Sequence, residues 1–69
     1  MALTEAEVTA AKADAKKYLE YSVQTLALTL GVASDEISSS MTIPVASDDI
    51  NYEAYDCLKK QAAALEALA

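Results

Sequence analysis

Residues 19–31 of this 69-residue chain read LEYSVQTLALTLG. Large apolar side chains recur in this stretch at intervals of four, three and four residues: Leu19, Val23, Leu26 and Leu30. This spacing places them on one face of an α-helix. The chain's only glycine, Gly31, follows where a helix commonly ends in a left-handed residue. Residues 23–30 also partly alternate and contain β-branched side chains, so a strand is the competing interpretation there.

The start of this helix is signalled upstream, at Thr4 and Glu7. A Ser/Thr residue followed three positions later by Glu forms a capping box, in which each side chain accepts a hydrogen bond from the other residue's backbone N–H. The sequence therefore predicts a helix over about residues 5–30. Its first half carries Lys and Glu side chains and only a thin apolar edge: Val8, Ala11, Ala15 and Tyr18.

A second helix is predicted over about residues 48–68, capped by Ser47 and with Asp48 and Asp49 complementing the helix dipole. Its apolar stripe comprises Ile50, Ala54, Cys57, Leu58, Ala62, Leu65 and Leu68. Residues 31–47 form the linker. One helical turn is expected over residues 34–37, capped by Ser34, and an extended segment, either unpaired or an edge strand, around Pro44.

The predicted fold class is all-α: one small domain in which two antiparallel helices form a hairpin with a partly extended, proline-containing linker. Hydrophobic residues make up 54% of the chain, but many are alanine and none is Phe or Trp. Domains of this size commonly need a disulfide, a metal or a partner for stability. A single cysteine excludes an internal disulfide, so we expect a homo-oligomer or one component of a larger assembly.

Charge and hydropathy narrow the classes of partner. The formal net charge is −6, with five lysines and no arginine, which disfavours direct contact with nucleic acid or an anionic membrane surface. No apolar stretch approaches the ~20 residues that span a bilayer. No secretory signal is visible, so the expected location is the cytoplasm or an assembled virion.

No catalytic, cofactor-binding or metal-binding residue is predicted. The chain has no histidine and too few glycines for a phosphate-binding loop. Cys57 is interpreted as a small buried hydrophobe because it lies in an Ala/Leu stripe. Acidic residues gather in the linker and at the start of the second helix: Asp35, Glu36, Asp48, Asp49, Glu53 and Asp56. They are interpreted as a solvated surface; the alternatives are attraction to lysines of a second copy and mimicry of nucleic acid.

The expected partner-binding residues are Tyr21, Leu28, Leu30, Tyr52 and Tyr55. Tyr21 and Leu28 are seven residues apart, so they share a side of the first helix that a single packed helix leaves uncovered. The two Tyr-x-x-Tyr pairs are either a half-buried rim or partner contacts.

These features predict a non-enzymatic structural or assembly subunit, or an adaptor, in a larger protein complex. Size and acidity suit a virion component of the phage head–tail connector or neck type. The alternative is a small acidic inhibitor that occludes a basic site on a partner enzyme.

Overall fold

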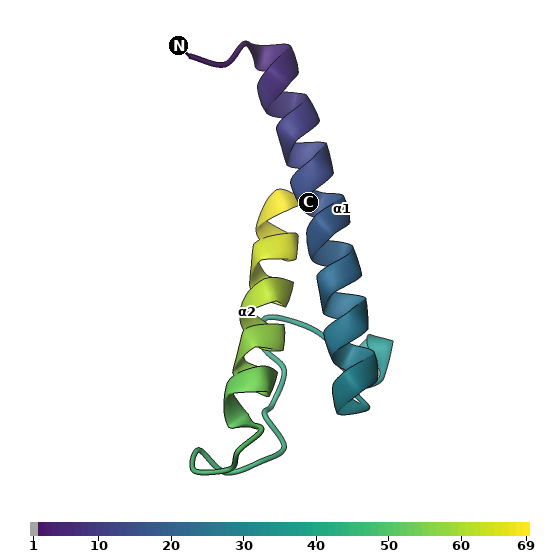
Figure 1. The fold of residues 1–69 in the computed structure, drawn as a ribbon, viewed down its shortest axis with the longest axis vertical. Coiled ribbons are helices and arrows are strands. Elements are labelled where there is room, and N and C mark those ends of the chain that lie inside the picture. The colour runs from purple at the N-terminus through teal and green to yellow at the C-terminus, as the bar shows by residue number, and fades with distance from the viewer. Residues whose placement is uncertain (1) are drawn as a thin grey trace.

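The computed structural model describes residues 2–69 as a hairpin of two α-helices (Figure 1). Helix α1 spans Glu5–Leu30 and helix α2 spans Tyr52–Leu68, with a short 3₁₀ turn, η1, at Ser34–Glu36 between them. The two helices pack side by side in opposite directions. The predicted all-α hairpin is confirmed, and residues 23–30 are helix rather than strand.

Local signals set both ends of α1 as predicted. At its start, the Glu7 N–H donates to Thr4 Oγ1 at 3.2 Å, and the Thr4 N–H donates to Glu7 Oε1 at 3.0 Å. At its end, Gly31 adopts φ 72°, in the left-handed region. The Gly31 N–H donates to the Ala27 and Leu28 carbonyls, and the Val32 N–H also donates to the Ala27 carbonyl at 2.9 Å, so these carbonyls of the last turn have partners.

The predicted start of the second helix is wrong by four residues. Helix α2 begins at Tyr52, its N-cap is Asn51, and Ser47 lies in the preceding turns. The reason is local: Asp49 Oδ1 accepts a hydrogen bond from the Asn51 N–H at 2.8 Å, and the Asp49 carbonyl accepts from the Tyr52 N–H at 3.1 Å. Asp side chains that bond the backbone two residues on favour a turn over a helix.

This shift also removes Ile50 from the predicted apolar stripe of α2. Ile50 lies in the turn before the helix and is 94% exposed.

The core between the helices is small. Its most buried side chains come from both helices and from the linker: Val23, Ala27, Met41, Leu58 and Ala62. Leu58 is 0% exposed and is the only large side chain in residues 2–69 that is fully buried. Five partly buried residues pack around this cluster: Leu26, Leu30, Val32, Ile37 and Leu65.

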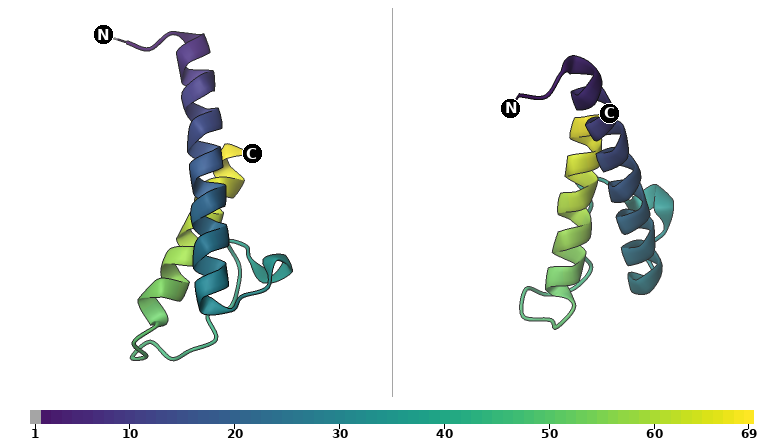
Figure 2. Two further views of the ribbon diagram at one scale, coloured as in Figure 1. Left: turned by 45° about the vertical axis from the view of Figure 1, so that its right-hand side comes forward. Right: turned by 45° about the horizontal axis from the view of Figure 1, so that its top comes forward.

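The linker covers one face of the helix pair. Met41 packs into the core against both helices. Nearby, the backbone N–H and hydroxyl of Ser39 donate to the two carboxylate oxygens of Glu66 at 2.8 and 2.7 Å, which fixes the linker to the last turns of α2. The turn η1 lies beside the end of α1, on the side away from α2 (Figure 2). The predicted turn is present, but its N-cap is Ala33 rather than Ser34.

No strand forms in residues 2–69, so the segment around Pro44 is unpaired.

Helix α1 is much longer than α2, and its first part projects beyond the C-terminal end of α2 (Figure 1). We call residues 5–18 the arm; every residue in it is exposed. Within residues 2–69, neither helix combines the length and hydrophobicity required to cross a membrane.

Candidate partner-binding face

The side of α1 that faces away from α2 carries large apolar residues in contact with solvent. Tyr21 is 71% exposed and Leu28 is 83% exposed. Around the helix axis, Tyr21 lies about 160° and Leu28 about 140° from the buried Val23, because helix positions advance by about 100° per residue. The single helix α2 leaves this side uncovered, which is the arrangement that the seven-residue spacing predicts.

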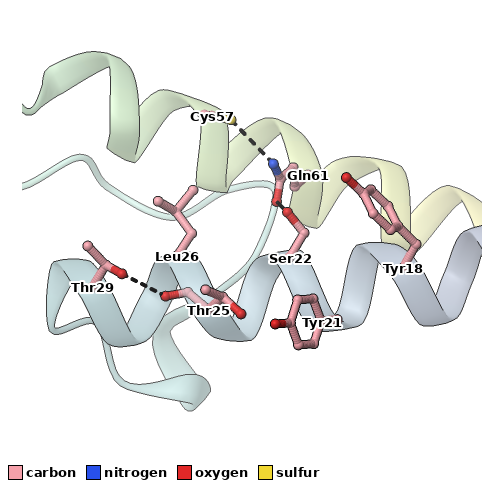
Figure 3. Close-up of a pocket in the computed structure, with 8 residues that line it drawn as sticks. All are labelled: Tyr18, Tyr21, Ser22, Thr25, Leu26, Thr29, Cys57 and Gln61. Atoms are coloured by element: carbon pink, nitrogen blue, oxygen red, sulfur yellow. Dashed lines mark hydrogen bonds between the residues drawn. The ribbon is translucent and has the colours of Figure 1, made fainter.

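Beside this surface, α1 and α2 enclose an open groove with a volume of about 380 Å³ (Figure 3). Its lining comes from the two helices and includes no linker residue: Tyr18, Tyr21, Ser22, Thr25, Leu26, Thr29, Cys57 and Gln61. A second hollow adjoins it along α2 and shares Cys57 and Gln61. The linker therefore covers one face of the hairpin and leaves this other face open.

A short polar network crosses the groove between the helices. The Ser22 hydroxyl donates to Gln61 Oε1 at 2.9 Å, and Gln61 Nε2 donates to Cys57 Sγ at 3.3 Å. Further along α1, the Thr29 hydroxyl donates to the Thr25 carbonyl at 3.0 Å. These bonds satisfy the polar side chains locally, and no buried side-chain N or O atom in residues 2–69 lacks a partner. The groove therefore presents an apolar surface without charges on its walls.

The buried interpretation of Cys57 is wrong: this thiol is exposed at the groove. The core-facing positions of α2 are Leu58, Ala62 and Leu65. Cys57 precedes Leu58 by one residue, so its side chain points about 100° away around the helix axis. The sequence pattern alone assigns both residues to one broad apolar stripe. The rotation of α2 against α1 then buries Leu58 and leaves Cys57 exposed.

The other three expected contact residues serve the hairpin itself. Leu30 packs against the core cluster. The Tyr55 hydroxyl donates to the Leu30 carbonyl at 3.4 Å, which links the start of α2 to the end of α1. Tyr52 is half-buried at the start of α2. The two Tyr-x-x-Tyr pairs thus differ, since the pair in α1 is exposed and the pair in α2 is half-buried.

Polar groove residues were missed at the sequence level. Ser22, Thr25, Thr29 and Gln61 are small or polar, so a search for apolar periodicity passes over them. The available signal was the thin apolar edge that ends at Tyr18, because its spacing continues through Ser22 and the two threonines.

The groove itself has no charged lining residue, whereas Glu53, Asp56 and Lys60 line the adjoining hollow. No three His, Cys, Asp or Glu side chains in residues 2–69 are grouped to hold a metal ion. Lys60 Nζ lies 2.9 Å from Asp56 Oδ2, and this hydrogen-bonded ion pair raises the pKa of Lys60. The linker and the turn before α2 lie toward the end of the hairpin opposite the arm (Figure 1). Their acidic residues are exposed: Asp35, Glu36, Asp48 and Asp49.

Comparison with known proteins gave no match to a protein-family model, to a curated protein or to a solved structure.

Proposed function

We propose that this chain is a non-enzymatic assembly subunit or adaptor that joins a larger protein complex through the open face of its hairpin. The observation that carries the proposal is the pair of exposed tyrosines, Tyr18 and Tyr21, that line the apolar groove, together with the exposed Leu28 at another hollow along α1. Aromatic residues are enriched at protein interfaces, and contiguous apolar patches on small proteins commonly mark binding sites.

The size of the core supports the same conclusion. Leu58 is the only large side chain in residues 2–69 that is completely removed from solvent. A hairpin with so small a core gains stability when its second apolar side is also buried. Binding of a partner to the folded chain alone stabilises that fold by mass action.

The specific form of the proposal is a virion component of the head–tail connector or neck type, present in the cytoplasm until it is assembled. Its support is the small size and the net charge of −6. Acidic surface keeps an unassembled subunit soluble and favours contact with basic protein surfaces.

The test compares native extracts containing the wild-type chain with extracts containing Leu28→Glu. The wild-type chain should elute from size-exclusion chromatography far ahead of a 69-residue monomer, and Leu28→Glu should elute as the monomer. Leu28 is 83% exposed, so the substitution should leave the helix content of the purified chain unchanged. Ala13→Glu is the matched control, since it adds the same charge at an exposed arm position about 22 Å along α1 from Leu28.

Co-elution of both variants with the wild-type complex would show that this face is not the contact surface. Elution of the wild-type chain as a free monomer in native extracts would refute the assembly function itself.

The exposed acidic end favours a second candidate, a small inhibitor that occludes a basic site on a partner enzyme. The variant Asp48→Asn/Asp49→Asn removes charge from the turn before α2 without changing the open face. Loss of partner binding in this variant, with binding retained in Leu28→Glu, would favour the inhibitor. The reverse pattern would favour the assembly subunit.

A further inference from the structure

The open groove is one section of a seam that runs the length of α1. Seven positions, spaced alternately by three and four residues, carry no charge: Val8, Ala11, Ala15, Tyr18, Ser22, Thr25 and Thr29. The last four of these line the groove. Alternating intervals of three and four residues are the spacing of the contact positions in a coiled coil. We call this set the α1 seam; it includes none of the α1 residues in the core cluster, although Ser22 hydrogen-bonds Gln61 of α2.

The side chains of the seam suit a helix that approaches closely. Ala11, Ala15 and Ser22 are small, which permits a short distance between helix axes. Tyr21 and Leu28 flank the seam on one side, because each immediately precedes a seam residue, Ser22 or Thr29, in the chain. A helix laid along the seam would therefore cover the exposed Tyr21 and Leu28 as well as the groove.

Charge at the two ends of the molecule selects the direction of that helix. Lys12 and Lys16 lie in the exposed arm, on the edge of the seam that faces the α2 side of the hairpin. Asp48, Asp49 and Glu53 are exposed at the other end, where α2 begins. A parallel pair of chains would set lysines beside lysines and carboxylates beside carboxylates. An antiparallel pair would set the lysines of each arm near the carboxylates of the other chain.

The length of the arm agrees with this pairing. Its 14 residues extend about 20 Å at the rise of an α-helix. In an antiparallel pair that sets Ala11 of one chain beside Thr29 of the other, the arm that projects beyond its own α2 lies alongside the partner's hairpin end.

We propose that a second copy of this chain docks antiparallel along the α1 seam. The lysines of each arm then lie beside the acidic start of the other copy's α2. This inference rests on the proposed function, because it names the partner that occupies the open face.

The test begins with sedimentation of the purified full-length chain over a range of concentrations. The wild-type chain should be dimeric at high concentration. Ala15→Glu, which places a charge in the seam, should be monomeric with unchanged helix content. Ala13→Glu, the same substitution two residues away and off the seam, should remain dimeric.

Crosslinking with a short bifunctional maleimide determines the direction. In a Cys57→Ser background, chains carrying Ala11→Cys should crosslink to chains carrying Thr29→Cys and not to one another. Efficient crosslinking among Ala11→Cys chains would mean parallel packing and would overturn the inference. A dimer that persists in Ala15→Glu would overturn it as well.

A wild-type chain that stays monomeric when purified, yet elutes in a large native complex that Leu28→Glu disrupts, would also overturn the inference. In that case the proposed function would stand with a different protein as the partner.

Discussion

Truncation of Leu58 to alanine tests whether the hairpin is held together where the structure places its core. Leu58 is 0% exposed and packs in the cluster with Val23, Ala27 and Met41. Leu58→Ala removes three carbon atoms from the point where both helices and the linker meet, so the loss of contacts affects all three segments.

The magnitude follows from the burial. Leu→Ala substitutions at fully buried positions cost about 2–5 kcal/mol, and the upper values belong to sites that cannot collapse. The neighbouring Ala27 and Ala62 have short side chains that fill little of the space, while the flexible Met41 can move partly into it. We therefore expect a loss of about 3 kcal/mol. A domain of this length has a total free energy of unfolding of about 3–10 kcal/mol. At the urea concentration that half-unfolds the wild type, the variant should therefore be almost entirely unfolded.

The matched control is Leu28→Ala, which makes the same chemical change within a helix at a position that is 83% exposed. It should change the free energy of unfolding of the monomer by less than about 0.5 kcal/mol. The assay is urea unfolding followed by circular dichroism, repeated at several protein concentrations. The Leu58→Ala effect should be present at every concentration, whereas the Leu28→Ala effect should grow with concentration as the monomers associate.

Two results would refute this reasoning. A loss below about 1 kcal/mol for Leu58→Ala would mean that this side chain is not in a packed core. Equal losses for Leu58→Ala and Leu28→Ala at low concentration would mean that the helices pack in another register.

Three further predictions address the cap, the linker and the thiol. Gly31→Ala should cost about 1 kcal/mol in thermal unfolding, because no atom lies near an added Cβ and only the left-handed backbone (φ 72°) is penalised; an unchanged or higher melting midpoint would contradict it. Hydrogen bonds from the Ser39 hydroxyl and N–H lower the pKa of Glu66 below its ordinary value of 4.5. The contact with the ionised carboxylate therefore stabilises the fold fully above pH 4.5, and this stabilisation is lost as the pH falls through the lowered pKa. Glu66→Gln should therefore lower the melting midpoint at neutral pH and match the wild type at about pH 2; an equal deficit at both pH values would exclude the carboxylate as the cause. Cys57→Ala should change the free energy of unfolding by less than about 0.5 kcal/mol and keep any biological activity, since the thiol is exposed; a folded but inactive variant would overturn the non-enzymatic proposal.

The ends of α1 could be read from the sequence because each depends on residues close along the chain. The capping box joins Thr4 to Glu7, and Gly31 ends the helix through backbone bonds to the preceding turn. The start of α2 is equally local, yet the cap predicted at Ser47 is four residues too early. The hydrogen bond from the Asn51 N–H to Asp49 Oδ1 forms a turn there, and the helix begins after it.

The exposed side of α1 was also predictable in part. The spacing of Tyr21 and Leu28 requires that they share one side, and a single partner helix cannot reach both that side and the core side. The groove was not predictable, because it depends on which face the linker covers.

Only tertiary packing decided the course of the linker and the side of α2 that faces the core. Met41 lies in the core, and the nearby Ser39 is hydrogen-bonded to Glu66, 27 residues away. The same packing directs Leu58 inward and leaves Cys57 exposed. Helix periodicity constrains the angles between side chains on one helix, but it does not fix the rotation of that helix against its neighbours. That rotation is set by contacts between segments far apart in the chain.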